Sequence, residues 1–384
     1  MGKIKESSKI TVCYFGTYIP EYPRNRVIIK GLLSQGINVV ECHFPLWHGI
    51  EPRIGKIRGL RRKLLLALKI LWAQCNLLVK HQNVPEYDLM IVGYTGHFDI
   101  FLAKILSSLR RKPLIFDFFW SMYCTFVEDR KVFKRGSLMA KFIKSIDRFS
   151  YKVSNLLLLD TQTHIKYISK TLKLNEKKFK RIWVGADESI FYPIKQKETG
   201  DFVVLFFGTF IPLQGVETII KSAKKLEKER ITFKIIGKGQ LSSYIHNLSK
   251  TLKLENCEFI EWIPLQNLAK EISQSDICLG IFGSSMKAAS VIPNKVFDAI
   301  ACNKPCISED SPAIREIFTD RKDILLVPPE DETSLSKAIL TLKNNNTLRE
   351  GITQNAYSLF LTCFSTKPIG YQIKKLVEET IQFF

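Results

Sequence analysis

Apolar residues along this chain occur in short runs that alternate with longer amphipathic segments. The first run, Ile10–Phe15, is closed by Gly16 and followed by a helical pattern and a second run at Ile37–Cys42. Strand-length runs separated by helix-length segments predict βαβ units and a parallel sheet. Further strands of the first half are expected at residues 87–92, 113–118, 155–159 and 180–184, and helices at 98–109, 137–153 and 162–171.

The same alternation restarts at Phe202–Phe207, after a polar and aperiodic stretch at 195–201 that we interpret as a linker. Further strands of the second half are expected at 231–236, 256–260, 276–281 and 306–308. The pattern predicts two successive doubly wound α/β domains, residues 1–195 and 196–366, and a last helix in 367–384 that packs back on the first domain. Ligands of such sheets lie at the carboxyl ends of the strands, so we expect a site in a cleft between two facing domains.

The stretch Met286–Asp310 predicts a loop that leads into a helix start facing an anion. Pro293 suits the first helical position, because its missing N–H would be unpaired there. The amides of residues 294–296 would then be free, and the helix dipole favours negative charge beside them. With Lys287 and Lys295 nearby, this predicts a grip for a nucleotide diphosphate. An ordinary solvated helix start is the alternative.

One turn further along the same helix, Asp298 shares a face with Asn294. A carboxylate in this place would accept hydrogen bonds from paired ribose hydroxyls. A solvated surface carboxylate is the alternative interpretation.

Positive charge is concentrated in the first half of the chain. The net charge is +20; residues 1–200 contain 35 Lys and Arg against 16 Asp and Glu, and residues 201–384 contain 22 against 21. This asymmetry predicts that the first half meets an anionic partner: a membrane surface, a phosphorylated lipid or a nucleic acid. No zinc-finger spacing, aromatic RNA-binding set or Gly-Lys-Ser/Thr loop accompanies the charge, which argues against nucleic acid.

The segment Leu60–Val79 is the best membrane candidate. Lys69 interrupts it and leaves ten uncharged residues from Ile70 to Val79, too few to span a bilayer. Basic residues at 56, 58 and 61–63 lead into it and Trp72 suits an anchor, so we predict a helix lying in the membrane interface. A buried amphipathic helix is the alternative. No signal peptide is expected at the start of the chain, which predicts a cytoplasmic protein on the inner face of the cell membrane.

The nine cysteines are scattered and mostly embedded in apolar runs, which indicates buried thiols in a reducing compartment. No cluster of Asp, His and Cys has the spacing of metal ligands, so we predict no metal and no cofactor. In the first half, Gly16 and Tyr18 follow the first strand and Asp117 follows the 113–118 strand, where they would face a ligand. A nicotinamide-dinucleotide fingerprint is absent, because the first loop has only one of its glycines.

These residues resemble the group 1, or family 4, glycosyltransferases, which have the GT-B fold of two Rossmann-like domains and retain anomeric configuration. In VLFFGTFIPLQGVETI, Gly208 matches the diphosphate-side loop of that family. IIGKGQ, with Gly237 and Gly239, followed by EWIP with Ile263, matches its base-side turn. The nucleotide-binding helix of the family is matched by VIPNKVFDAIACNKPCI. The resemblance implies that Asp298 in this helix binds the ribose hydroxyls of the nucleotide.

Three features depart from the family pattern. Ser290 stands where a Glu often contacts the sugar, and Thr209 and Gln214 stand where Arg and Lys commonly neutralise the diphosphate. The usual first-domain histidine is missing, and Asp117 lies near the matching place. We therefore expect the neutralising charge to come from Lys287 and Lys295, with Thr209 and Gln214 bonding phosphate oxygens.

The resemblance implies a metal-independent glycosyltransferase of hexosyltransferase type. Its donor would be a nucleotide sugar and its acceptor a saccharide or lipid-linked carrier, in surface polysaccharide or lipopolysaccharide assembly. The alternatives are an epimerase or phosphorylase of the same fold, an inactive relative, and a basic nucleic-acid-binding protein.

Overall fold

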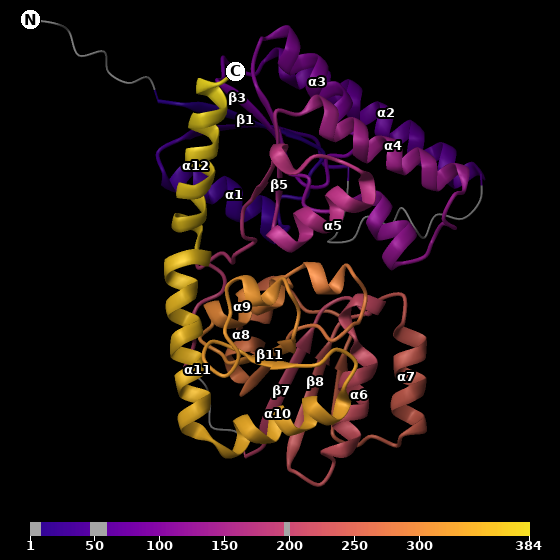
Figure 1. The fold of residues 1–384 in the computed structure, drawn as a ribbon, viewed down its shortest axis with the longest axis vertical. Coiled ribbons are helices and arrows are strands. Elements are labelled where there is room, and N and C mark those ends of the chain that lie inside the picture. The colour runs from indigo at the N-terminus through magenta and orange to yellow at the C-terminus, as the bar shows by residue number, and fades with distance from the viewer. Residues whose placement is uncertain (1–8, 47–59, 196–199) are drawn as a thin grey trace, which may run out of the picture. The chain divides into compact units, whose positions relative to one another are not determined.

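The computed structural model describes residues 9–46, 60–195 and 200–384, and the chain forms two compact units (Figure 1). Unit 1 comprises Met1–Asp160, Ile168–Trp183 and Thr366–Phe384, and unit 2 comprises Thr161–Tyr167 and Val184–Ser365. Most of the predicted linker, residues 196–199, lies outside the described residues.

The chain passes into unit 2 at Val184, about a dozen residues before the predicted boundary at 195. The cause is that the segment after Val184 already packs on unit 2. The amide of Ala186 donates to the carbonyl oxygen of Phe364 at 3.1 Å, and the ring of Phe191 is buried.

Unit 1 contains a parallel six-stranded sheet in the order β2-β1-β3-β4-β5-β6. Its strands are β1 (Thr11–Gly16), β2 (Asn38–His43), β3 (Leu89–Val92), β4 (Leu114–Phe116), β5 (Leu156–Leu159) and β6 (Phe179–Arg181). Its helices are α1 (Pro23–Ser34), α2 (Leu60–Gln82), α3 (Ile100–Leu109), α4 (Leu138–Val153) and α12 (Thr366–Gln382), and α5 (Gln162–Leu172) runs from unit 2 into unit 1.

Helix α12 packs against α1, although more than 330 residues of sequence separate them. The two helices cross at Gly31 and Gly370, where a Cβ on Gly31 would lie 2.8 Å from the Cα of Gly370. Only residues without a side chain permit this approach. The C-terminal helix therefore completes unit 1.

Unit 2 contains a second parallel six-stranded sheet in the order β12-β11-β10-β7-β8-β9. Its strands are β7 (Phe202–Phe207), β8 (Ile231–Ile236), β9 (Cys257–Ile260), β10 (Ile277–Leu279), β11 (Cys306–Glu309) and β12 (Leu325–Val327). Its helices are α6 (Val216–Lys225), α7 (Ser242–Thr251), α8 (Leu265–Gln274), α9 (Asn294–Ala301), α10 (Glu332–Asn344) and α11 (Asn346–Leu359).

The predicted α/β class with two Rossmann-like domains is confirmed. The central strands are apolar and buried, as expected of parallel sheets; β3, for example, is the fully buried run LMIV. Two details differ from the sequence-based expectation. The strand expected at 180–184 ends at Arg181, and β12 with α10 and α11 was not foreseen.

Candidate functional site

The strand order of unit 2 reverses between β7 and β10, the place where ligands of doubly wound sheets bind. The loop after β7 begins at Gly208, and the loop after β10 leads through a short 3₁₀ turn, Ala288–Ser290, to α9. The amide of Phe282 donates to the carbonyl of Gln214 at 3.1 Å, so the two loops are held together.

Two glycines allow these loops to approach so closely. Gly215 has a left-handed φ of 63°, and a Cβ there would lie 2.4 Å from the carbonyl carbon of Phe282. Gly237, with φ 147°, follows β8, and a Cβ there would lie 1.9 Å from the carbonyl oxygen of Gly208. Side chains at either position would force the loops apart. The structure thus brings the predicted residues Gly208 and Gly237 together, and Gly239 lies beside Thr209 in the same place.

Helix α9 begins one residue later than predicted. Pro293 is the N-cap, with φ −69° and ψ 141°, and Asn294 is the first helical residue. The amide of Val296 donates to the carbonyl of Pro293 at 2.9 Å, so the prediction of three free amides is wrong for Val296. The amides of Asn294 and Lys295 lie in the first turn, where the helix itself supplies no partner.

Lys295 extends from α9 to the loop after β7. Its Nζ donates to Oε1 of Gln214, and it lies 3.8 Å from the ring centroid of Phe206, a cation–π contact. A Cβ on Gly208 would lie 2.8 Å from the same Nζ. The sequence predicted that Lys295 and Gln214 both bind the diphosphate. In the structure the two side chains contact each other. Phe206 was missed, because a strand phenylalanine gives no signal of such a role.

The environment of Lys295 disfavours the charged form of its amine relative to water. The residue is only 6% exposed, and its two contacts above are uncharged. Burial lowers the pKa of Lys295 well below its ordinary value, and the charges of Cys306 and Asp298 oppose this effect. An anion at the loop after β7 would favour the ammonium form of Lys295. The surroundings of Lys295 therefore suit a negatively charged ligand.

Asp298 lies one turn into α9 and is 5% exposed. Its carboxylate acts on Lys295 by raising the pKa of the amine. In this structure Asp298 is therefore an electrostatic neighbour of Lys295, and its contact with a ribose stays a prediction.

The remaining predicted residues of unit 2 lie on the loops around this place. Ser290 is buried, and its hydroxyl donates to the carbonyl of Met286 at 2.6 Å. Its own carbonyl accepts a 2.6 Å bond from Oγ1 of Thr161. Ser290 therefore holds the loop, and its contact with a sugar stays a prediction. Lys287 and Ile263 are partly exposed on the loops after β10 and β9.

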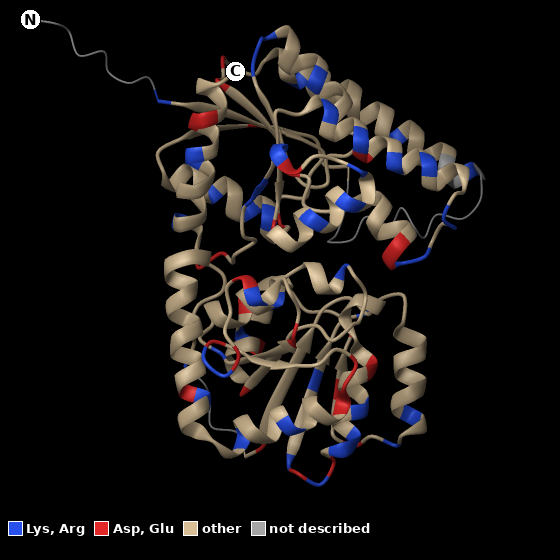
Figure 2. Ribbon diagram, viewed as in Figure 1, with Lys and Arg blue, Asp and Glu red and all other residues tan. Residues whose placement is uncertain are grey.

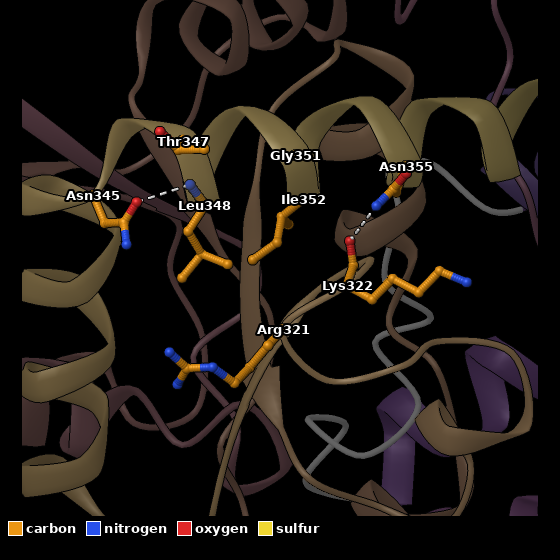
Figure 3. A pocket seen from close by; sticks show the side chains of 8 residues that line it. All are labelled: Arg321, Lys322, Asn345, Thr347, Leu348, Gly351, Ile352 and Asn355. Carbon is orange, nitrogen blue, oxygen red and sulfur yellow. Dashed lines mark hydrogen bonds between the residues drawn. The ribbon is translucent and has the colours of Figure 1, made fainter.

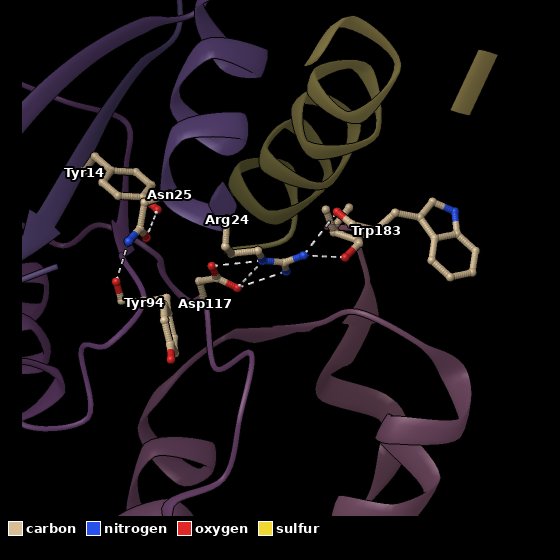
Figure 4. A network of polar contacts seen from close by, with 7 residues as sticks. Tyr14, Arg24, Asn25, Tyr94, Asp117 and Trp183 are labelled. Atoms are coloured by element: carbon tan, nitrogen blue, oxygen red, sulfur yellow. Dashed lines mark hydrogen bonds and ion pairs between the residues drawn. The ribbon is translucent and has the colours of Figure 1, made fainter. Parts of the chain in front are cut away.

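In unit 1 the structure assigns Asp117 a structural role (Figure 4). Asp117 and Arg24 are both fully buried, and the guanidinium bonds both carboxylate oxygens at 2.9 to 3.1 Å. Arg24 also donates to the carbonyls of Ile182 and Trp183. The pair joins α1 to the ends of β4 and β6. Both carboxylate oxygens of Asp117 bond Arg24, contrary to the prediction that Asp117 faces a ligand. Arg24 was missed, because 93 residues separate the partners.

The first loop of unit 1 is also occupied by internal contacts. A Cβ on Gly16 would lie 2.7 Å from Oδ2 of Asp99, which accepts from the amide and hydroxyl of Thr17 at 2.7 and 2.9 Å. Tyr18 is buried, and its hydroxyl donates to Glu41 at 2.5 Å. The close approach predicted at Gly16 is therefore made by Asp99, and Tyr18 does not line an open surface.

A cavity of about 600 Å³ lies elsewhere in unit 2 (Figure 3). It is lined by the turn at Arg321 and Lys322, which precedes β12, and by the first turns of α11. It therefore lies at the amino edge of the sheet, opposite the edge that carries the loops after β7 and β10. Its walls bring no catalytic groups together. Among the described residues no group of His, Cys, Asp and Glu could hold a metal ion.

Comparisons with solved structures establish the fold as GT-B. Sucrose-phosphate synthase from Thermosynechococcus elongatus superposes with a TM-score of 0.74 at 14% identity, covering 98% of this chain and 100% of that chain. HepE of Anabaena in complex with UDP-glucose superposes with a TM-score of 0.69 at 16% identity, covering 97% and 99%.

Residues 188–359 match the family model described as glycosyl transferases group 1. The uncharacterized glycosyltransferase MJ1178 of Methanocaldococcus jannaschii is 27% identical over 56% of this chain and 58% of its own length. The lipopolysaccharide core biosynthesis glycosyltransferase LpsD of Rhizobium meliloti is 25% identical over 44% of this chain and 47% of its own length. The chain thus spans about half the length of these relatives. Residues 188–359 therefore form a group 1 glycosyltransferase domain.

Proposed function

We propose that this protein transfers a hexosyl group from a nucleotide-sugar donor to a lipid-linked acceptor, with retention of anomeric configuration. The observation that carries the proposal is the buried Lys295, whose Nζ lies against Gly208 at the switch point of unit 2. The UDP-glucose bound to HepE supports a nucleotide-sugar donor. The naming of LpsD supports a role in lipopolysaccharide or surface-polysaccharide assembly.

Transfer from a nucleotide sugar builds negative charge on the departing diphosphate. Preorganised positive groups stabilise that charge without a metal ion. In this proposal the Lys295 ammonium and the first amides of α9 bind the diphosphate, and Gln214 turns its amide to a phosphate oxygen. Asp298 accepts bonds from the ribose. No cofactor takes part, because the nucleotide sugar is itself the substrate.

Unit 1 would contribute the acceptor side and bring the enzyme to the membrane. We propose a cytoplasmic protein bound to the inner face of the cell membrane, where a lipid-linked acceptor and an anionic surface occur together. The excess positive charge of residues 1–200 supports this placement.

The test has two stages. Thermal-shift titration with a panel of nucleotide sugars identifies the donor, which we expect to raise the melting temperature through binding. The purified chain is then incubated with that donor, radiolabelled in the sugar, and a membrane lipid extract. We expect label to enter the lipid phase with release of nucleoside diphosphate, unaffected by EDTA. Turnover of the donor at the same rate without extract would indicate an epimerase or hydrolase and contradict the proposal.

A further inference from the structure

Large apolar side chains are exposed on one helical layer of unit 1. Helix α2 exposes Leu64, Leu68, Leu71 and Trp72, each by more than half of its surface. Of its apolar side chains only Ala73 and Leu77 are buried, among those that the structure describes in this helix. A soluble helix normally buries its apolar stripe, so a helix that exposes most of it has a further partner.

The neighbouring helices α3 and α4 continue this surface. Ile105 and Leu109 on α3 are 58% and 77% exposed, and Leu138 and Phe142 on α4 are 85% and 57% exposed. Contacts between the helices place them in one layer. Gln74 of α2 donates to Asp99 beside α3 at 2.8 Å, and the rings of Phe101 and Phe149 stack between α3 and α4 at 4.6 Å. Figure 1 shows the three helices alongside one another.

The segment that carries α3 and α4 is also strongly basic. Residues 100–153 contain twelve Lys and Arg against four Asp and Glu. The three aspartates among these four are buried, and the fourth residue, Glu128, is paired with Arg135. Figure 2 shows Lys and Arg at intervals along these helices. Arg111, Lys141 and Arg148 are exposed. Apolar side chains rimmed by cations match a bilayer surface of anionic lipid.

From these contacts we propose that α2, α3 and α4 form a single docking surface for an anionic lipid bilayer, with α2 lying in the interface. This inference rests on the proposed function for its purpose, which is to bring the enzyme to a lipid-linked acceptor. Binding to the bilayer needs neither donor nor acceptor. Vesicle binding and donor binding are therefore measured separately, and a failure of one leaves the other intact.

Helix α2 lies along the layer because unit 1 holds it there. By length and composition alone, Leu64–Gln82 is long and apolar enough to cross a membrane, contrary to the expectation drawn from Lys69. Its other face, however, is bound to the unit. Besides the Gln74 bond, the carbonyl of Leu77 accepts from Cys42, and Nζ of Lys80 donates to the carbonyl of His43 at 2.8 Å. A crossing helix would lose all of these contacts. The predicted basic residues at 56 and 58 lie outside the described residues, as do the side chains at 62 and 63.

Vesicle flotation of the full chain tests the docking surface. We expect the chain to float with vesicles containing phosphatidylglycerol, to float poorly with phosphatidylcholine alone, and to be released by salt, because screening weakens the attraction to the lipid headgroups. Leu71→Ser with Trp72→Ser should reduce partitioning roughly a hundredfold, since each large apolar side chain contributes about a factor of ten. Trp262→Ser, at a 67% exposed residue of unit 2, is the matched control and should change nothing.

Cys75 supplies a second, independent readout. Cys75 is the exposed cysteine of α2. Cys257→Ser and Cys363→Ser remove the two partly exposed cysteines, so that a polarity-sensitive fluorophore attached to Cys75 reports the polarity around α2. We expect its emission to shift to the blue with phosphatidylglycerol vesicles, whereas a label at Tyr244→Cys on α7 should not respond. Flotation unchanged in the double variant, or equal with both lipids, would overturn the proposal. So would a dimer that the double variant disrupts while vesicles bind neither protein, because a second copy would then cover the layer.

Discussion

Replacing Lys295 by Met separates a ligand-binding role from a structural one. Met fills a similar volume and keeps the contact with the Phe206 ring, but it removes the buried amine. Burial lowers the pKa of Lys295 well below its ordinary value, which means that charging it without an anion costs free energy. The variant should therefore melt at the same temperature as the wild type or higher.

Donor affinity should change in the opposite direction. Each hydrogen bond from a charged group contributes roughly 1.5–3 kcal/mol, so loss of the ammonium should weaken nucleotide-sugar binding about ten- to hundredfold. The wild type and Lys295→Met are compared by isothermal titration with the donor found in the panel, and by calorimetric melting without it.

A swap provides the matched control. The Nζ of Lys295 contacts Gln214, so Gln214→Lys with Lys295→Gln moves the cation across the same contact. The swapped protein should recover much of the affinity that Lys295→Gln alone loses. A melting temperature that falls in Lys295→Met with donor affinity intact would refute the reasoning, because Lys295 would then be a structural residue.

Three further predictions follow from the same contacts. Donor binding should be accompanied by uptake of a proton at Lys295. Between the lowered pKa of Lys295 in the free protein and its higher pKa with diphosphate bound, donor affinity should fall as pH rises. Below that pH range, donor affinity should be constant. Titration calorimetry in buffers of different ionisation enthalpy should detect this uptake in the wild type and find none in Lys295→Met; equal values in both would exclude Lys295 as the group. Asp298→Asn should weaken donor binding about tenfold or more, measured by titration beside the surface variant Asp310→Asn, and unchanged affinity would remove Asp298 from the site. Asp117→Asn leaves the buried Arg24 uncompensated and should lower stability by about 3–5 kcal/mol in denaturant unfolding while donor affinity persists; a stable variant that has lost only transfer would return Asp117 to the active centre.

The sequence predicted the elements of the fold because its strands are short apolar runs and its helices are amphipathic. It predicted that the last helix packs back on the first domain, but it did not indicate the place of contact, because Gly31 and Gly370 are far apart in the sequence. The strand β12 is three residues long, too short to give a periodic signal.

The site was predictable in part for a similar reason. The loop glycines and Lys295 lie in sequence motifs, and the structure brings them close together, while their contacts with a donor stay predictions. The roles of Asp117 and Tyr18 depend on buried partners distant in sequence, Arg24 and Glu41, and no pattern along the chain reveals such pairs. Both residues follow a strand, which is equally expected of a ligand-binding and of a structural side chain.

A crystal structure with the tightest-binding nucleoside diphosphate of the panel tests the central claim most directly. We predict a diphosphate oxygen about 2.7–2.9 Å from Nζ of Lys295, beside Gly208 and the first turn of α9. A diphosphate bound away from the loops after β7 and β10, with Lys295 still bonded to Gln214, would contradict the account.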